Sequence, residues 1–518
     1  MKIVHDADRP EASAQTLMHM LLHSAQNNPT GDALVVVGGV RLSYADLFAS
    51  VAEFATELRK RGSVGDRVAV ALQNSADTVI AILGAMASGA QAVLLNPFYT
   101  DRELEPIIAD ADPLLVVCSN EFSSQHSSLL KCTSRAAPVA LAYPFASLVR
   151  RASEVDAAAI AMPKPEDLAI LQYTGGTTGR SKGVNLNHRT TATNILQREA
   201  LLPTRFKSER FLCMTPLFHS YATATSFFPT IYSAGCLVVM PRYDADEALN
   251  AIEEEKISLF GGAPTIYNGL VTHPKFAKSN FSPLLGAYSG GAPLTVSTLN
   301  EWERVTGVPI AEGYGLTEAT AVLCFNPLKG VRKAGSVGLP LPETEIEVVD
   351  ADDGKTIVRP GHTGELRARG PQLMVGYRGQ PAATVEIIRD GWLYTGDIGE
   401  IDADGYVYIR DRKKDMAIVA GYNVFPRELD ELLSSHSDVV EAVSAGVPDS
   451  YRGEIMQACV KMRPDSSCTE EELIQFCSKN LARYKVPQKI FFVDEIAKTG
   501  PGKIDRKKAK EWMISNTL

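Results

Sequence analysis

Apolar positions in the first 400 residues alternate between helical and strand-like spacing. The two patterns follow each other as helix 43–61, strand 67–72, helix 76–87, strand 92–95, helix 101–111 and strand 114–118. Ser43 is a suitable N-cap for the first of these helices. Strands that alternate with helices are typical of parallel sheets covered by helices. We therefore predict an α/β fold whose large N-terminal domain contains doubly wound sheets.

The pattern changes at two points further along the chain. Between 343 and 369 the strands shorten and are separated by turn residues, which favours a small antiparallel, β-barrel-like subdomain. A charge run at 411–415 comes next, and new strands at 439–447 and 456–462 follow it. We predict three parts: a large N-terminal domain at 1–411, a hinge at 412–414, and a small mobile α+β C-terminal domain at 415–518.

The helix expected after these two strands carries a capping signal. Thr469 precedes Glu472 by three residues, which is the spacing of a capping box. The sequence therefore predicts a helix that begins at Thr469.

Composition narrows the function class. Of the 518 residues 45% are hydrophobic and 22% are charged, and the net charge of −9 argues against nucleic acid as a partner. Eight cysteines without a C-x-x-C pair indicate reduced thiols. The longest apolar stretch, 79–95, is interrupted by small and polar residues, so we interpret it as a buried helix and strand, not a transmembrane segment. We expect a cytoplasmic protein.

The segment 173–183 has the composition of a phosphate-binding loop. It follows the apolar run 168–171, and a helix is expected near Asn187. Glycines let backbone N–H groups converge on an anion, and hydroxyls and Lys182 add donors. The candidate phosphate ligands are Thr174, Gly175, Gly176, Thr177, Thr178, Gly179 and Lys182. A linker between two halves of the domain is the alternative.

Three further clusters carry candidate chemistry. In 313–318 a ring, a hydroxyl and a carboxylate surround a glycine turn, so a base could stack on Tyr314 and Glu318 could hold Mg²⁺. In 391–397, Asp397 could accept from both ribose hydroxyls, or could form only an Asx-turn. In 498–503, Lys503 could neutralise phosphate charge if the C-terminal domain closed, although most such lysines are solvated.

One histidine stands apart from these clusters. His219 lies among apolar residues in 216–221, which is more typical of a satisfied core histidine than of a base.

The order of these segments resembles the adenylate-forming superfamily, which contains acyl-CoA synthetases, adenylation domains and firefly luciferase. Fatty-acyl-CoA ligases look most similar. The matching segments are 173–183, 216–219, 289–293, 313–318, 391–397, 411–414, 421–428 and 498–506. The resemblance implies that ATP·Mg²⁺ and a small-molecule carboxylic acid give an acyl-adenylate and pyrophosphate, and that the thiolate of coenzyme A then displaces AMP.

The resemblance also implies residue roles. Thr317 would contact the α-phosphate, and Lys503 would bridge the carboxylate and the α-phosphate. Tyr314 would contact the adenine, Asp397 and Arg412 the ribose, and Glu318 the Mg²⁺ ion. Lys414 would be the hinge, and His219 would support catalysis. Further nucleotide or thioester contacts would come from Gly290, Gly291, Ala292, Gly313, Gly315 and Gly421. Two positions depart from the family pattern, Gly175 in place of serine and Ser181 in place of proline, which puts the reaction rate in doubt.

The acyl pocket is expected to be apolar and roomy. Its predicted lining is Tyr221, Thr225, Gly262, Ala263, Gly290 and Gly315. The segments that contain these residues hold no charge besides His219 and Glu318, which disfavours amino acids and dicarboxylates. A medium- or long-chain fatty acid fits, and so does an aryl or alicyclic carboxylate. A non-catalytic nucleotide-binding regulator and a luciferase-like oxidase remain as alternatives, and a homo-oligomer stays open.

Overall fold

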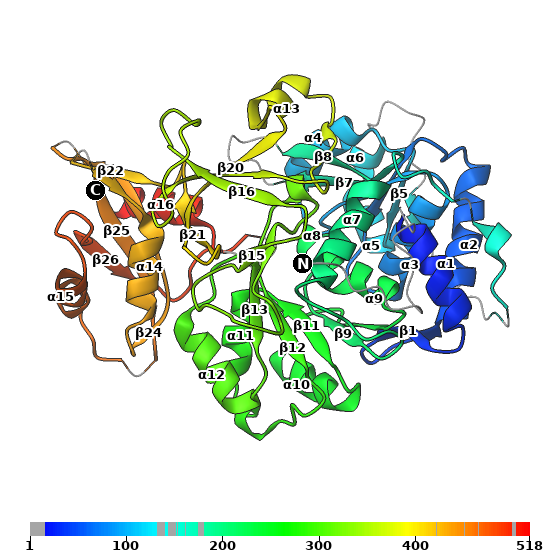
Figure 1. The fold of residues 1–518 in the computed structure, drawn as a ribbon, viewed down its shortest axis with the longest axis horizontal. Coiled ribbons are helices and arrows are strands. Elements are labelled where there is room, and N and C mark those ends of the chain that lie inside the picture. The colour runs from blue at the N-terminus through cyan, green and yellow to red at the C-terminus, as the bar shows by residue number, and fades with distance from the viewer. Residues whose placement is uncertain are drawn as a thin grey trace.

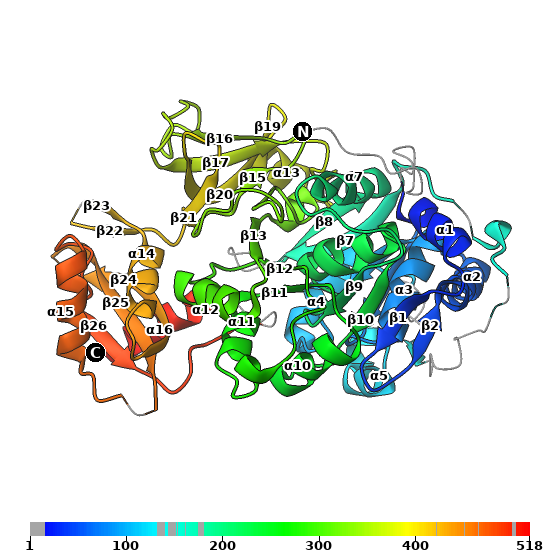
Figure 2. The same cartoon turned by 60° about the horizontal axis from the view of Figure 1, so that its bottom comes forward.

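The structure is a computed structural model that describes residues 16–131, 140–142, 152, 154–160, 162–174, 181–420, 422–449, 451–464, 466–499 and 504–517. Figure 1 shows the described part of 417–518 (orange to red) at one end of the molecule, joined to the rest through β21. The remainder is built from three sheets and their covering helices, and Figure 2 shows the sheet of β16 to β20 on one side of the other two.

The first sheet has nine strands, and its central pairs are parallel. In spatial order its strands are β15 (Leu339–Pro340), β14 (Cys324–Phe325), β13 (Ile310–Tyr314), β12 (Gly286–Ser289), β11 (Leu259–Gly262), β9 (Arg210–Cys213), β10 (Cys236–Val239), β1 (Asp32–Val36) and β2 (Arg41–Ser43). This confirms the predicted α/β class with helix-covered parallel sheets.

The second sheet has seven strands. In spatial order they are β18 (Gly376–Tyr377), β8 (Lys182–Asn187), β7 (Leu168–Thr174), β4 (Gln91–Leu94), β3 (Arg67–Ala71), β5 (Leu115–Cys118) and β6 (Ala140–Ala142). The strands from β7 to β6 are parallel to their neighbours, whereas β8 and β18 extend the edge in antiparallel fashion. The three predicted strands of this sheet lie within one residue of the expected bounds.

Helices cover both of these sheets. They are α1 (Leu17–Asn27), α2 (Tyr44–Lys60), α3 (Ala76–Ala87), α4 (Asp101–Ala111), α5 (Asn120–Gln125), α6 (Ser127–Lys131), α7 (His188–Glu199), α8 (Ser220–Ala222), the π-helical turn η3 (Thr223–Phe227), α9 (Phe228–Tyr232), α10 (Ala245–Glu254), α11 (Pro264–Val271) and α12 (Val296–Thr306). The Ser43 side chain accepts from the backbone of Asp46, so the predicted N-cap of α2 is confirmed.

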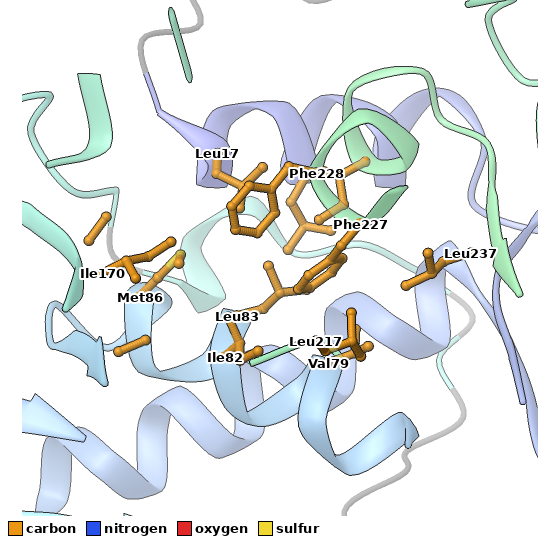
Figure 3. Close-up of a cluster of buried hydrophobic side chains, with 14 of the residues drawn as sticks. Leu17, Val79, Ile82, Leu83, Met86, Ile170, Leu217, Phe227, Phe228 and Leu237 are labelled. Atoms are coloured by element: carbon orange, nitrogen blue, oxygen red, sulfur yellow. The ribbon is translucent and has the colours of Figure 1, made fainter. Parts of the chain in front are cut away.

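The largest hydrophobic core lies between the two sheets. Every residue of α3 except Asp77 is buried, which explains why its sequence is apolar on nearly all faces. Figure 3 shows its side chains Val79, Ile82, Leu83 and Met86 beside Phe227, Phe228, Leu17 and Ile170, in the cluster that also holds Leu217 and Leu237. The rings of Phe227 and Phe228 lie 5.0 Å apart.

The third sheet is antiparallel, as the shortened strands predicted. Its five strands are β16 (Glu345–Val349), β17 (Gly364–Arg369), β19 (Ile388–Arg389), β20 (Trp392–Ile401) and β21 (Val407–Arg412), and α13 (Pro381–Ile387) precedes β19.

The C-terminal part has its own sheet and core, so it is built as a separate α+β unit. Its elements are β22 (Ala417–Val419), β23 (Tyr422–Val424), α14 (Pro426–Ser434), β24 (Val439–Asp449), β25 (Gly453–Met462), α15 (Glu470–Asn480), β26 (Lys489–Phe492) and α16 (Arg506–Thr517). The Thr469–Glu472 capping box of α15 is present, which confirms that prediction.

Candidate active site

Several predicted site residues lie at the carboxyl ends of strands in the two large sheets. Tyr314, Gly262 and Thr174 each end a strand of the two large sheets, and Gly290 follows the end of β12. The carboxyl ends of parallel strands are where α/β folds hold ligands. The topology therefore gathers segments that are far apart in the sequence.

Tyr314 and Asp397 are in direct contact although 83 residues separate them. The Tyr314 hydroxyl donates to Asp397 Oδ2 at 2.6 Å. Arg412 lies directly opposite Asp397 in the β20–β21 register, and its Nε is 3.6 Å from Asp397 Oδ1. The three residues predicted to hold adenosine thus form one group, which we call the adenosine corner.

The Asp397 carboxylate is held in a nearly closed environment, with 14% of its side chain exposed. Burial raises the pKa of the Asp397 carboxyl, and Arg412, the Tyr314 hydroxyl and Lys414 partly offset this rise. An ionised carboxylate offers about four acceptor positions. Tyr314 and Arg412 therefore leave acceptor capacity on Asp397 for a pair of ribose hydroxyls.

Glu318 and Lys182 meet on either side of one tyrosine that the sequence did not single out. Tyr377 belongs to β18, which pairs with β8 and so lies beside the strand that begins at Lys182. Its hydroxyl donates to Glu318 Oε1 at 2.7 Å, and Lys182 Nζ is 4.9 Å from its ring centre. The ring links the cation proposed for phosphate to the carboxylate proposed for the metal.

The Glu318 carboxylate fits a magnesium ion that is shared with phosphate oxygens. Mg²⁺ is bound in proteins through one or two carboxylates together with substrate phosphates. The hydroxyl of Tyr377 fixes one oxygen of Glu318, and the carboxylate retains further acceptor positions.

Thr317 lies at the start of a strained turn. It opens the short 3₁₀ helix Thr317–Ala319, after which Thr320 and Ala321 take left-handed φ values of 53° and 85°. A Cβ at Gly315 would lie 1.8 Å from the carbonyl oxygen of Ala321, so only glycine permits this turn. Ser220 Oγ is 3.4 Å from Thr317 Oγ1, which connects the turn to the acyl pocket.

Four of the six predicted acyl-pocket residues form one connected group. The Tyr221 hydroxyl donates to the carbonyls of Tyr288 and Gly262 at 2.8 and 3.4 Å. Thr225 Oγ1 donates to the carbonyl of Tyr221 at 2.7 Å. A Cβ at Gly290 would lie 2.7 Å from Tyr221 Cε2, so a larger residue at position 290 would clash with the Tyr221 ring. Ala263 follows Gly262 as the N-cap residue of α11.

A narrow cavity of about 10 Å³ lies beside this group, enough for about one water molecule. Its lining comes from β7, β8, α7, α8, η3, α9 and the turn after Thr317. The lining residues are Ile170, Gln172, Leu186, Thr191, Asn194, Ile195, Ser220, Thr223, Ala224, Phe228 and Thr320.

His219 has a local structural role. It is the N-cap of α8, and its Nδ1 accepts from the backbone N–H of Tyr221 at 3.1 Å. A neutral imidazole that accepts at Nδ1 carries its proton on Nε2. His219 can thus present a donor, and its predicted catalytic role stays a prediction.

Several predicted ligands lie outside the described residues. They are Gly175, Gly176, Thr177, Thr178, Gly179, Gly421 and Lys503. Thr174 and Lys182 are paired across β7 and β8, so the phosphate-loop candidate joins two antiparallel strands. The helix expected near Asn187 is confirmed, since α7 begins after its N-cap Asn187. The strand β8, which precedes this helix, was not predicted; it is short and Val184 and Leu186 are its only large apolar residues.

Gly313, Gly291 and Ala292 lie where two sheet strands end. Gly313 is within β13, and Gly291, with φ 80°, and Ala292 follow Gly290 after β12. A Cβ at Gly313 would lie 2.4 Å from Phe325, so packing alone requires glycine there.

The predicted hinge separates two sheets. The strand β21 ends at Arg412 and β22 begins at Ala417 in the C-terminal sheet, with the exposed residues Lys413 and Lys414 between them. Burial of its amino group and the nearby Arg412 lower the pKa of Lys414. The backbone N–H of Arg427 donates to Asp411 Oδ2 at 2.8 Å across this junction.

Two family models match the chain. The first, AMP-binding enzyme, matches residues 21–378, which is more than half of the chain. The second, AMP-binding enzyme C-terminal domain, matches residues 428–503.

Curated relatives cover nearly the whole chain. A long-chain-fatty-acid–CoA ligase of Bacillus subtilis is 36% identical, with 99% of this chain and 97% of the relative covered. A feruloyl-CoA synthase of Amycolatopsis is 34% identical over 90% of this chain and 93% of its own length.

Solved structures agree in shape. The ATP-bound MatB of Rhodopseudomonas palustris superposes with a TM-score of 0.88 at 29% identity, covering 97% of this chain and 100% of that one. The apo form of the same enzyme, with the same coverage and identity, gives 0.78. Since the MatB sequence is common to both, this difference reflects shape and not sequence.

Proposed function

Because this chain belongs to the AMP-binding enzyme family, we propose that it is an ATP-dependent carboxylic acid–CoA ligase that acts on a medium- or long-chain fatty acid. The carboxylate attacks the α-phosphate of ATP to give an acyl-adenylate and pyrophosphate, and the thiolate of CoA then displaces AMP. The observation that carries the proposal is the adenosine corner, Tyr314–Asp397–Arg412, beside the Glu318–Tyr377–Lys182 group.

Each group of residues has a distinct task in this reaction. Asp397 accepts from the ribose hydroxyls while Tyr314 fixes the carboxylate and offers its ring to adenine. Lys182 balances charge on the terminal phosphates, and Thr317 donates to the α-phosphate. Glu318 would hold a magnesium ion, which would supply neutralisation of the phosphate charge. Lys503 neutralises charge as the carboxylate attacks.

The two half-reactions use the C-terminal domain in two positions. We propose that it rotates about Lys414, which withdraws Lys503 after adenylation and brings the Gly421 segment to the thioester site. The better superposition on the ATP-bound MatB than on its apo form supports placing the present arrangement near the nucleotide-bound one.

An aryl carboxylate is the second candidate substrate class. The relative from Amycolatopsis is named for a feruloyl substrate and is nearly as similar to this chain as the fatty-acid ligase is.

We propose that the enzyme is cytoplasmic. Six of the seven described cysteines are buried and all seven are free thiols, as expected in a reducing compartment. Among the described residues, we find no helix with the length and apolar character needed to cross a bilayer.

The test is pyrophosphate release with ATP, Mg²⁺ and CoA across a panel of acids. The panel includes acetate, octanoate, dodecanoate, palmitate, benzoate, cyclohexanecarboxylate and coumarate. We expect a clear optimum among the fatty acids, and an optimum at coumarate would select the aryl class instead.

Two outcomes would redirect the proposal. ATP binding without turnover of any acid would favour the non-catalytic alternative, and Gly175→Ser would then be the first reversion to make. Oxygen uptake that depends on acyl-adenylate would favour the luciferase-like alternative.

A further inference from the structure

Arg198 carries a buried cation that the sequence did not place in the acyl pocket. It lies near the end of α7, and 1% of its side chain is exposed. Its Nη1 donates to Glu199 Oε1 at 2.8 Å. Within the described part of the chain, its Nε and Nη2 have no hydrogen-bond partner. Buried polar groups in native proteins are nearly always paired, so two open donors on one guanidinium need an explanation.

The helix directs Arg198 toward the substrate side of the fold. Thr191, Asn194 and Ile195 of α7 line the narrow cavity beside Ser220 and Thr223. Arg198 lies three residues after Ile195 and four after Asn194, so it occupies the same helical face. One turn of helix advances about 5.4 Å, which places Arg198 just past the cavity.

Tyr288 connects Arg198 to the predicted acyl pocket. The Arg198 guanidinium carbon lies 5.3 Å from the centre of the Tyr288 ring. The carbonyl of Tyr288 accepts from the Tyr221 hydroxyl, and the Tyr288 hydroxyl interacts with the Arg198 side chain but makes no well-aligned hydrogen bond to any described residue. Nε and Nη2 of Arg198 and the hydroxyl of Tyr288 therefore lie on two neighbouring side chains, and none of the three makes a well-aligned hydrogen bond to a described residue.

The sheet face that carries Tyr288 faces the pocket. Tyr288 pairs with Gly261 in the β11–β12 register, so side chains at the two positions point the same way. A Cβ at Gly261 would lie 2.8 Å from Thr225 Oγ1 and 3.4 Å from the Tyr221 hydroxyl. The absent side chain of Gly261 thus lets Thr225 and the Tyr221 hydroxyl pack directly against the strand beside Tyr288.

The charges of Arg198 and Glu199 determine which chemical group could bind beside them. Glu199 compensates the Arg198 cation, and its other oxygen accepts from the backbone and hydroxyl of Thr204. A second carboxylate here would be an uncompensated buried charge, which is costly. A neutral oxygen would be free of that cost and would satisfy Nε and Nη2, which lie on one edge of the guanidinium.

We propose that Arg198 and Tyr288 form a polar subsite of the acyl pocket, and that the preferred acid carries a neutral oxygen along its chain or ring. A hydroxyl, ether or carbonyl oxygen would accept from Arg198, and a hydroxyl could also pair with Tyr288. This inference rests on the proposed ligase function and narrows its substrate class. It also refines the expectation of an apolar pocket, which was drawn from segments that did not include α7.

The experiment compares acids that differ only in this oxygen. Dodecanoate is assayed against hydroxydodecanoates with the hydroxyl at successive carbons, and cinnamate against coumarate. The readout is kcat/KM for pyrophosphate release. We expect one oxygenated acid to exceed its plain partner by about tenfold or more, because a hydrogen bond to a charged donor replaces unpaired buried groups.

Two variants assign the preference to the subsite. The double variant Arg198→Met with Glu199→Gln removes the cation without leaving Glu199 charged and unpaired, and it should abolish the preference while plain acids are still used. Tyr288→Phe deletes only the hydroxyl beside Arg198 and should reduce the preference by severalfold. Thermal unfolding of both variants shows whether the protein remains folded.

The outcomes separate the inference from the proposed function. Equal use of every plain and oxygenated pair by the native enzyme overturns the subsite and leaves the ligase function standing. An unchanged preference in the double variant also overturns it. Absence of turnover with all acids overturns both.

Discussion

The adenosine corner and the hinge are neighbours in the structure but are held in different ways. In the corner, a 2.6 Å hydrogen bond joins Tyr314 to a carboxylate that is 14% exposed. In the hinge, the exposed residues Lys413 and Lys414 connect two separate sheets, and Lys413 pairs with Glu365 at 2.8 Å while Lys414 remains the exposed pivot candidate. Buried, hydrogen-bonded groups keep one geometry, whereas exposed charges gain little from any single arrangement. The comparison favours our proposals of a fixed nucleotide site and of a movable connection beside it.

Arg412 belongs to both regions. It ends the last strand before the hinge, and it lies opposite Asp397 in the register of that sheet. With a side chain 56% exposed, it can leave Asp397 at little cost when the C-terminal domain moves. The predictions below separate the fixed part of the site from the movable part.

The largest effect is expected for Lys503→Ala. Loss of the cation that neutralises the attacking carboxylate and the α-phosphate should lower adenylation by about a thousandfold. Thioester formation from supplied acyl-adenylate should be largely retained, because the proposed movement withdraws Lys503 before that step. The two half-reactions are measured separately. Lys498→Ala is the matched control, since Lys498 precedes the same segment and pairs with Glu441 at 3.2 Å. Equal loss of both half-reactions would remove the assigned role.

The opposite pattern is expected for Lys414→Pro. Proline fixes φ and restricts the preceding residue, so it should block rotation at the hinge. Adenylation should stay within a few fold of the native rate, while thioester formation falls by about a hundredfold. Lys414→Ala keeps the backbone free and serves as the control. Normal thioester formation in the proline variant would place the pivot elsewhere.

Substitutions in the fixed corner should affect nucleotide binding in both half-reactions. Asp397→Asn removes the charged acceptor and should raise the KM for ATP by about tenfold. Tyr314→Phe keeps the aromatic ring but removes the hydrogen bond to the Asp397 carboxylate, and we expect the KM for ATP to rise by about threefold. Both values come from initial rates at saturating acid. An unchanged KM in Asp397→Asn would show that ribose binds elsewhere.

The sequence predicted the helices and strands of the N-terminal domain better than it predicted the contacts between residues that are distant in the sequence. Helices such as α3 and α4 were found with their observed bounds, because apolar periodicity and caps are local signals. Tyr314 and Asp397 were each identified, but their contact depends on how the separate sheets that contain β13 and β20 lie against each other. Tyr377 was missed because it stands in a two-residue strand whose partner, β8, was itself not predicted.

Arg198 shows a different limit of sequence reasoning. Its type and its place near the end of α7 suggest a solvated residue, since arginines are rarely fully buried. Only the packing of α7 against Tyr288 makes it a buried cation with open donors. The acyl pocket was therefore predicted as apolar from strands and turns that did not include α7.

Glu312 belongs to the strand that carries Tyr314 and interacts electrostatically with helix α14 of the C-terminal part. It lies in β13 two residues before Tyr314, accepts from the backbone N–H of Leu294, and faces Arg427 and Glu431 of α14. Burial raises the pKa of Glu312 to about 7 from an ordinary value of 4.5. The smallest effect we predict concerns the stability of the fold and arises from this residue.

Glu312→Gln should change how stability depends on pH. Because the native pKa lies above the unfolded value, the native state holds an extra proton between about pH 4.5 and pH 7, and the contribution of Glu312 to stability falls as the pH rises through this window. Glutamine can still accept from Leu294 and has no charge to desolvate. The variant should therefore lose this part of the pH dependence and should gain roughly 2 to 3 kcal/mol at pH 8. Urea unfolding of both proteins at pH 5 and pH 8 measures the change. If the two proteins lose stability equally between these pH values, Glu312 is ionised throughout the window, and the charges of α14 hold it in that form.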